Sequence, residues 1–239
     1  MLAFLAACVR GRANVVISGG TSSGKTTLLG VLSSFVPDGE RLITIEDAAE
    51  LRLAKPHVIG LEARPANAEG RGEVTVRDLV RNALRMRPDR IIIGEVRGGE
   101  ALDMLQAMNT GHDGSLSTAH ANSARHSLWR LETMALMSDV DLPVAHVRAQ
   151  VALAIDIVVH TARLRDGRRV VFQIAAVEGL DDEGDPVVAE VFGFRPRVGR
   201  HGAFVCSGVV PSVARLLRER GAALEEDAFA PGVDGPETG

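Results

Sequence analysis

The sequence predicts an α/β fold organised around a mostly parallel central sheet, and three features of the chain favour this fold class. A short β-branched run, Val15–Ile17, leads directly into a glycine-rich loop and then into a helix with apolar residues at helical spacing. Strand and helix patterns alternate from there to about residue 154, as expected of βαβ units that build a parallel sheet. Over residues 155–210 the pattern changes to period two with turns rich in Asp and Gly, which indicates antiparallel strands at the sheet edge or in a small meander.

The glycine-rich loop matches the phosphate-binding P-loop pattern Gly-x-x-x-x-Gly-Lys-Thr over residues 19–26. Its glycines allow successive backbone N–H groups to point at phosphate oxygens, and the N-terminus of the following helix adds a partial positive charge. Lys25 is expected to reach the β- and γ-phosphates, and the Thr26 hydroxyl to hold Mg²⁺. We therefore expect a nucleoside triphosphate site in a RecA-like sheet. The residues expected to contact the nucleotide are Gly19, Gly20, Thr21, Ser22, Ser23, Gly24, Lys25, Thr26 and Thr27.

Between residues 41 and 154 each element has a local signature. Arg41–Ile45 is expected to form a strand, whereas residues 55–74, with two prolines, three glycines and no periodicity, are expected to form an irregular loop. A helix should begin at Val76 and end before Pro88. The next expected elements are a buried strand at 90–95, a helix at 100–109, a strand at 115–120, a helix capped by Ser123 and a helix over 143–154.

The two ends of the chain are expected to lie outside the nucleotide domain, which spans residues 13–223. Residues 1–12 are expected to be a helix tail or linker packed beside that domain. Residues 224–239 are acidic and contain Gly and Pro, so a disordered tail is expected there. The antiparallel portion between these ends is expected to hold strands at 155–163, 168–177, 186–194 and 203–209, followed by a helix from Ser212 to Glu219.

Composition narrows the classes of partner. The net charge of −4 gives no general attraction to nucleic acid or anionic membrane, and an aromatic content of 3 % leaves few rings to stack on bases. Cys8 and Cys206 lack metal-ligand spacing, which suits free thiols in a reducing cytosol. No apolar run reaches the roughly 18 residues that a membrane-spanning helix needs. We therefore expect a cytoplasmic protein that neither binds nucleic acid nor inserts into a membrane.

Three polar residues end successive predicted strands, namely Glu46, Glu95 and His120. The carboxyl ends of parallel strands converge on one crevice, so these side chains should gather around the triphosphate. One acid could orient the attacking water while the other stabilises Mg²⁺ directly or through a bound water, and His120 could donate to the γ-phosphate. Each residue also has a structural interpretation, since Glu46 suits the first turn of a helix and an isolated His120 is more often a core histidine.

Four segments, in this order, resemble the signatures of the type II/IV secretion ATPase superfamily. They are Gly19–Thr27 (Walker A), Ile43–Leu51 (Asp box), Leu84–Ala101 (Walker B) and Thr110–Ser123 (His box). Within this superfamily the chain looks most similar to the CpaF-type ATPases of Flp/Tad pilus assembly. The superfamily's Walker B carries glycine where other P-loop enzymes have aspartate, and Gly94 matches that pattern.

The resemblance implies an ATP- and Mg²⁺-dependent motor that works as a cytoplasmic homohexamer. Such a motor drives pilus assembly or protein secretion by acting on an inner-membrane platform protein, to which it lies peripherally. The resemblance implies that Glu46 is the acid at the water, that Glu95 is the Walker B acid near Mg²⁺, and that His120 is near the γ-phosphate, without deciding which acid is the base. Arg81 and Arg85 match arginines that reach phosphate within or across subunits, although such arginines also occur on solvated helix faces.

The chain differs from the family pattern in the segment before the P-loop. These ATPases usually carry an N-terminal domain before the P-loop domain, whereas this P-loop strand begins about a dozen residues into the chain. The chain thus resembles a C-terminal motor domain, and the alternative is a nucleotide-binding module with little turnover of its own. A DNA motor is disfavoured by the acidic balance and the scarce aromatics, and a GTPase by the lack of an Asn-Lys-x-Asp motif.

Overall fold

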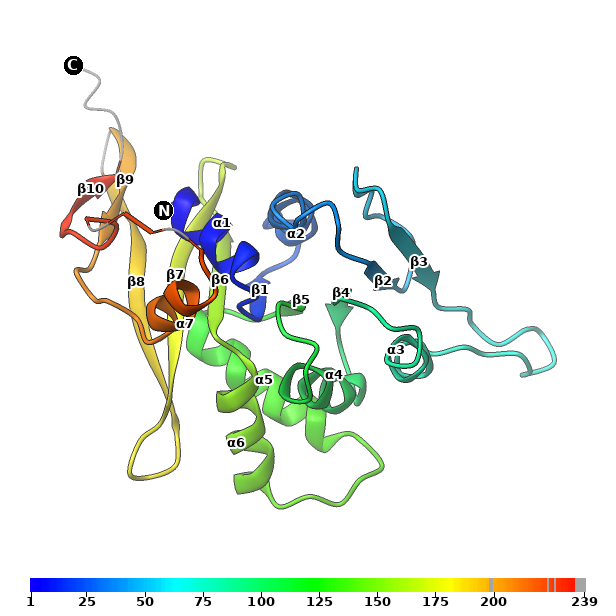
Figure 1. Ribbon diagram of the computed structural model, residues 1–239. Coiled ribbons are helices and arrows are strands. Elements are labelled where there is room, and N and C mark those ends of the chain that lie inside the picture. Colours follow the sequence, from blue (N-terminus) through cyan, green and yellow to red (C-terminus); the bar gives the residue numbers. More distant parts are fainter. Residues whose placement is uncertain (198–199, 223, 226, 235–239) are drawn as a thin grey trace.

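The computed structural model describes residues 1–197, 200–222, 224–225 and 227–234, and its strands form one ten-stranded sheet with helices on both faces (Figure 1). The strands are β1 (Val15–Gly19), β2 (Leu42–Glu46), β3 (Val58–Glu62), β4 (Arg90–Val96), β5 (Leu116–His120), β6 (Ile157–Arg163), β7 (Arg169–Leu180), β8 (Pro186–Arg197), β9 (Arg200–Cys206) and β10 (Gly232–Asp234). The helices are α1 (Leu2–Arg10), α2 (Lys25–Ser33), α3 (Val76–Ala83), α4 (Glu100–Asn109), α5 (Ala124–Leu136), α6 (Val144–Ala154) and α7 (Val213–Glu219). Within the described ranges no helix combines the length and apolar character needed to cross a membrane.

The strand order is β10-β9-β8-β7-β6-β1-β5-β4-β2-β3. Every pair from β6 to β3 is parallel, and every pair from β6 outward to β10 is antiparallel. This order confirms the predicted α/β class with an antiparallel extension at the sheet edge. The sequence places β6 among the antiparallel strands, but it pairs with β1 in parallel. Period-two alternation reports which faces of a strand are covered and carries no information on its direction.

Two hydrophobic clusters fill the space between the sheet and its helical layers. One cluster contains buried residues of α3 to α6, and the other contains those of α1, α2 and α7. Alternation divides the side chains of β1 between them, since Val16 belongs to the first cluster and Val15 and Ile17 to the second. Figure 1 shows the same division, with α3 to α6 on one face of the sheet and α1 and α2 on the other. Covering both faces buries β1 and β2 along their whole length.

One segment expected to be an irregular loop contains a strand. Within residues 55–74, Val58–Glu62 forms β3, the edge strand beside β2, and Arg64 and Val74 form an isolated bridge. The prediction of a loop throughout is therefore wrong. As an edge strand, β3 pairs on one side only, and its side chains are only partly buried. Partial burial does not require a strict alternation of apolar and polar residues, so the sequence gives only a weak signal for this strand. The two prolines lie outside the strand, where they interrupt no ladder.

Both ends of the chain pack into the domain where they are described. The α1 helix buries Phe4 and five further residues, so residues 2–10 form a helix that packs against the nucleotide domain and contributes to its core. Phe229 is buried edge-on against Phe4, with ring centroids 5.5 Å apart, and β10 pairs with β9. The expected disorder from residue 224 is therefore wrong for residues 227–234, because Phe229 supplies an apolar anchor that an acidic composition conceals. Residues 223, 226 and 235–239 lie outside the described residues.

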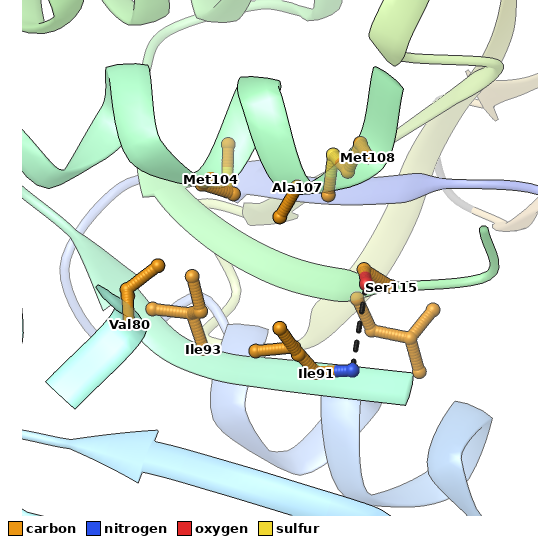
Figure 2. A pocket seen from close by; sticks show the side chains of 8 residues that line it. Val80, Ile91, Ile93, Met104, Ala107, Met108 and Ser115 are labelled. Atoms are coloured by element: carbon orange, nitrogen blue, oxygen red, sulfur yellow. Dashed lines mark hydrogen bonds between the residues drawn. The ribbon is translucent and has the colours of Figure 1, made fainter. Parts of the chain in front are cut away.

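A narrow apolar seam lies between α4 and strands β4 and β5 (Figure 2). Its lining includes Ile93 of β4 and Met104 of α4, and Ser115 is the polar residue in it. The Ser115 hydroxyl accepts a hydrogen bond from the Ile91 amide at 3.4 Å and donates to the His112 carbonyl at 2.8 Å, so it is already satisfied. The seam is core packing and offers no polar group to a ligand.

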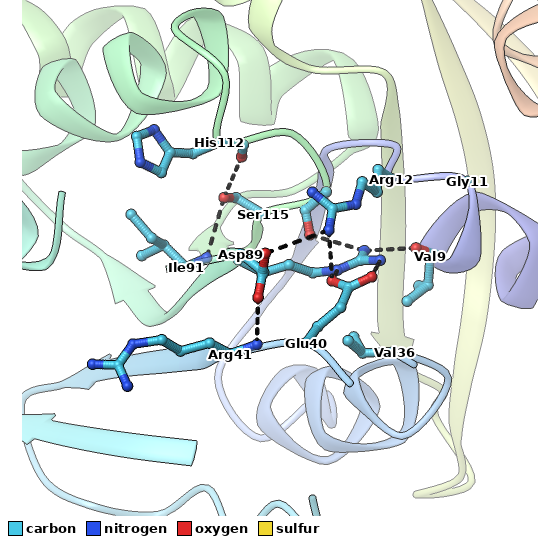
Figure 3. Close-up of polar contacts among 12 residues, drawn as sticks. Val9, Gly11, Arg12, Val36, Glu40, Arg41, Asp89, Ile91, His112 and Ser115 are labelled. Carbon is cyan, nitrogen blue, oxygen red and sulfur yellow. Dashed lines mark hydrogen bonds and ion pairs between the residues drawn. The ribbon is translucent and has the colours of Figure 1, made fainter. Parts of the chain in front are cut away.

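A buried arginine, Arg90, joins the elements at the amino ends of the parallel strands, and Figure 3 shows its partners Glu40 and Val9. Arg90 begins β4, and its guanidinium forms a bidentate pair with Glu40, with Nε–Oε2 and Nη2–Oε1 distances of 2.6 and 3.1 Å. Its Nη1 donates to the carbonyls of Val9 at 2.6 Å and Gly114 at 3.3 Å. One side chain thereby links α1, the loop before β2, and the loop before β5.

Asp156, just before β6, supplies a pH-dependent contribution to stability. Burial raises the pKa of Asp156 from 3.8 to about 6, although the Asn14 amide donates to its Oδ2 at 2.7 Å. Because the folded pKa lies above the unfolded one, the stability linked to this proton is full below about pH 4 and is lost as the pH rises through 6. At pH 8 the loss amounts to about 3 kcal/mol, from a shift of about two pKa units at about 1.4 kcal/mol each.

We therefore expect Asp156→Asn to stabilise the fold at pH 8 and to have little effect at pH 4.5. Asparagine keeps an acceptor for the Asn14 amide and removes the buried charge. Urea unfolding of both proteins at the two pH values measures the difference. An equal effect at both pH values would contradict the assignment of the shift to this carboxylate.

Candidate nucleotide-binding site

The P-loop leaves the carboxyl end of β1 and turns into α2 without an interruption. Gly24, the residue before α2, has a φ of 98°, and Ser22 has a φ of 57°, so both occupy the left-handed region that lets amides turn inward. Gly19 is required by close approach, because a Cβ there would lie 2.4 Å from Thr161 Oγ1 and 2.5 Å from Ser23 Oγ. The loop residues therefore form a tight turn, with two residues in the left-handed region, of the kind that phosphate-binding loops use.

The amino group of Lys25 folds back over this loop. Its Nζ donates to the carbonyls of Gly19 and Gly20 at 3.2 and 3.1 Å, and it lies 3.9 Å from Glu95 Oε1. Burial lowers the pKa of Lys25, an effect that Glu95 opposes and Arg97 reinforces. The ammonium group of Lys25 therefore lies over the loop, where two backbone carbonyl oxygens accept its hydrogen bonds.

A cavity of roughly 560 Å³ opens above the loop, a size suited to a small-molecule ligand. Glu46, Glu95 and His120, predicted from three separate strand ends, all line it together with Lys25. The sheet explains this grouping, because β1 and β5 are neighbours with Gly19 in register with His120. The full lining is Thr21, Ser22, Lys25, Thr26, Glu46, Asp47, Ala48, Glu50, Gly94, Glu95, Arg97, Thr118 and His120.

A bulge in β4 aims Glu95 into the cavity. The pairing of β4 with β5 shifts register between Ile93 and Val96, and the Gly94 carbonyl accepts a hydrogen bond from Thr118 Oγ1 at 2.6 Å. Adjacent residues of a regular strand face opposite sides of the sheet, yet Gly94 and Glu95 both line the cavity. The extra residue at the bulge accounts for this difference.

Glu46 is the most firmly held acid of the site. Its side chain is buried, and its Oε1 accepts from the amides of Glu50 and Leu51 at 3.1 and 3.0 Å. A Cβ on Gly94 would lie 3.0 Å from Glu46 Cγ, so the glycine of the Walker B segment makes room for this carboxylate. No helix follows Glu46 directly in the described chain, so the interpretation of Glu46 as a helix-start acid is wrong.

The two predicted arginines lie on α3 and its C-terminal end, away from the cavity lining. Arg81 Nε donates to Asp103 Oδ1 at 2.7 Å, which ties α3 to α4, and Arg85 is exposed. His112 also lies outside the lining, in the loop before β5 (Figure 3). Among the P-loop residues, Ser23 lies outside the cavity lining, and its Oγ contacts Thr161 Oγ1 of β6 at 2.8 Å. Ser23 therefore supports the loop from the side of the sheet.

Sequence reasoning missed Arg97, which lines the cavity beside Glu95. Its Nε donates to Glu95 Oε2 at 2.6 Å, its Nη2 pairs with the same oxygen, and its Nη1 lies 3.0 Å from Asp47 Oδ2. The hydrogen bond to Glu95 raises the pKa of Arg97 above its ordinary value. The available signal was its position two residues after Glu95, at the same strand end.

The donor set suits Mg²⁺ bound together with phosphate. Within the described ranges no group of three or more His, Cys, Asp or Glu side chains could enclose a metal. Mg²⁺ is usually held by one or two protein oxygens plus substrate phosphates and waters, so an enclosed site is not required. The Thr26 hydroxyl and the Glu95 carboxylate, which line the same cavity, are oxygen ligands of the kind this ion prefers.

Comparisons with known proteins agree with this geometry. Residues 1–177 match the family model described as "Type II/IV secretion system protein". The type IV secretion system protein PtlH of Bordetella pertussis is 45 % identical over 184 residues, covering 74 % of this chain and 54 % of that protein. The conjugal transfer protein TrbB of Rhizobium radiobacter is 38 % identical over 172 residues, covering 70 % of this chain and 49 % of that protein.

A solved structure shows the same fold. The VirB11 ATPase of the Brucella suis type IV secretion system, in complex with sulphate, aligns with a TM-score of 0.67 and 36 % identity, covering 73 % of this chain and 51 % of that one. The chain spans about half the length of the relatives it matches. The family match covers well over half of the chain and includes all four sequence signatures. The chain therefore belongs to the type II/IV secretion system protein family.

Proposed function

We propose that this chain is the ATP-hydrolysing motor domain of a machine for pilus assembly or protein secretion. The observation that carries the proposal is the shared cavity, in which the P-loop lysine lies with two carboxylates and an imidazole at the ends of parallel strands. Family membership and the similarity to a VirB11 ATPase support the same function.

In this proposal the P-loop amides and Lys25 hold the β- and γ-phosphates. Bound Mg²⁺ would neutralise charge on these phosphates, with Thr26 and, directly or through water, Glu95 as its protein ligands. Glu46 orients the attacking water, because its buried carboxylate is fixed by two backbone amides, whereas Glu95 lies next to Lys25. His120 donates to the γ-phosphate. Gly19 to Thr27 complete the phosphate cradle.

The proposed motor is a cytoplasmic homohexamer that works at the inner face of the membrane through a platform protein. In such a ring an arginine of one subunit could reach the phosphate of the next. Arg85 suits this role better than Arg81, because Asp103 already engages Arg81. The names of PtlH, TrbB and VirB11 fit secretion and conjugation, and the similarity to CpaF-type pilus ATPases stays a prediction.

ATP turnover of the wild type and three variants tests the proposed function. We expect Lys25→Ala and Glu95→Gln each to lower the rate by about 100-fold or more, the usual cost of removing one electrostatic contact to a reacting group. Arg215→Gln, which removes an exposed ion pair with Glu219 on α7, is the control and should keep the wild-type rate. Equal rates in all four proteins would end the ATPase assignment.

A second candidate is a nucleotide-binding module with little turnover of its own. The P-loop and the cavity lining would serve nucleotide binding in this candidate as well, so it differs from the motor only in turnover. Tight binding of ATP without phosphate release, in the wild type and at high protein concentration, would support this candidate over the motor. A role in binding nucleic acid is disfavoured by the net charge of −4.

A further inference from the structure

Arg97 is the second cation of the cavity and is held there by two carboxylates. Lys25 and Arg97 are the lysine and arginine side chains in the cavity lining, against the four carboxylates of Glu46, Asp47, Glu50 and Glu95. A triphosphate entering this acidic surface needs cations for its terminal oxygens. Arg97 is close enough to Lys25 to lower the pKa of that lysine, so both cations act on the same space.

The ion pairs of Arg97 are of a kind that exchange easily. Its side chain is 67 % exposed, whereas its partners Asp47 and Glu95 are 50 % and 21 % exposed. The exposed pair with Asp47 therefore contributes little to stability, and the exposed guanidinium can leave Glu95 without breaking any other contact of the core. The backbone around it is fixed, because Glu100 Oε1 accepts from the amides of Arg97 and Gly98 at 2.6 and 2.9 Å. The guanidinium can therefore change partners by side-chain rotation alone. Its planar fork matches two oxygens of a phosphate as well as those of a carboxylate.

The present partner of Arg97 is a residue that the reaction needs elsewhere. Glu95 Oε2 is occupied by Arg97, and Glu95 Oε1 faces Lys25 Nζ at 3.9 Å. A γ-phosphate placed beside Lys25 would compete with Glu95 and Asp47 for the Arg97 guanidinium. ADP ends one phosphate earlier and offers no such competitor.

We propose that Arg97 is a γ-phosphate-binding residue that exchanges Glu95 and Asp47 for the terminal phosphate, which frees Glu95 only when a triphosphate is bound. This inference rests on the proposed function and extends it, since it makes Arg97 the residue that distinguishes ATP from ADP. Asp47 is the competing carboxylate that holds Arg97 back in the absence of nucleotide.

Binding calorimetry with Mg²⁺ and either ADP or a non-hydrolysable ATP analogue tests the exchange. For Arg97→Gln we expect the affinity for the analogue to fall about 10-fold or more, with the affinity for ADP changed by less than about 2-fold. For Asp47→Asn, which removes a competitor, we expect the analogue to bind several-fold more tightly. Arg215→Gln is the matched control, because it also breaks an exposed Arg–Glu pair, and both affinities should stay at the wild-type value.

The outcomes separate this inference from the proposed function. Equal losses for both nucleotides in Arg97→Gln, or no loss for either, would overturn the exchange while leaving a Lys25-dependent ATPase intact. Weaker binding of the analogue to Asp47→Asn would also overturn it. A wild-type protein that binds neither nucleotide would remove the proposed function and this inference together. Circular dichroism of each variant confirms that the compared proteins are folded.

Discussion

Replacing Arg90 with alanine is expected to lower the free energy of unfolding by about 3–5 kcal/mol, the usual cost of leaving one partner of a buried ion pair behind. The Arg90 side chain is 0 % exposed, and that of its partner Glu40 is 13 % exposed. The substitution would remove the bidentate partner of the Glu40 carboxylate and the Arg90 hydrogen bonds to the carbonyls of Val9 and Gly114, leaving Glu40 only its longer contact with Arg12. It would also open a void where α1, β4 and the loop before β5 meet.

Urea unfolding followed by circular dichroism measures this effect. Arg12→Ala is the matched control, because Arg12 also pairs with Glu40, at 3.4 Å, but its side chain is 36 % exposed. We expect the control to cost less than about 1 kcal/mol. The double variant Arg90→Met with Glu40→Leu should recover much of the loss, since apolar residues of similar volume often replace a buried pair without penalty. A loss below 1 kcal/mol for Arg90→Ala would show that the pair does not hold these elements together.

Arg90 also shows where sequence reasoning ends. The apolar run after it predicts a buried strand, and β4 is that strand. Its partner Glu40 is fifty residues away, and no local pattern links the two. Tertiary ion pairs depend on how loops meet in space, so the same reasoning overlooked Arg97 and its contact with Asp47. Strand direction is also a tertiary property, which explains why the parallel pairing of β6 with β1 was not predicted beside its antiparallel pairing with β7.

The grouping of Glu46, Glu95 and His120 could be predicted for a different reason. Each ends a strand that the sequence predicts, and parallel strands deliver their carboxyl ends to one edge of the sheet. Their approach therefore follows from topology, and no knowledge of side-chain contacts is needed. The resemblance alone points to Arg81 and Arg85, and Arg81 on α3 and Arg85 just after this helix both lie outside the cavity lining. Site residues at the ends of parallel strands are thus easier to predict from the sequence than site residues on or after a helix.

The second large effect is expected at Gly19, and it separates this glycine from its neighbour in the loop, Gly20. A methyl group on Gly19 would lie 2.4 Å from Thr161 Oγ1 and 2.5 Å from both Ser23 Oγ and the Thr161 carbonyl. Those hydroxyls hold the loop, because Ser23 Oγ donates to the Gly20 carbonyl at 2.8 Å and Thr161 Oγ1 donates to the Ser18 carbonyl at 3.1 Å. Gly19→Ala must therefore displace either the loop or β6.

Overpacking of this kind costs about 1–3 kcal/mol, so we expect the nucleotide affinity of Gly19→Ala to fall about 10- to 100-fold. Gly20→Ala is the matched control. A Cβ at Gly20 meets nothing within 4 Å, and its φ is not in the left-handed region, so we expect a change of only a few-fold. Calorimetry with ADP and Mg²⁺ measures both variants. If the two substitutions weakened binding equally, the loop would need glycine for approach to the phosphate rather than for contact with β6, and the support that Ser23 and Thr161 give to the loop would have no role in binding.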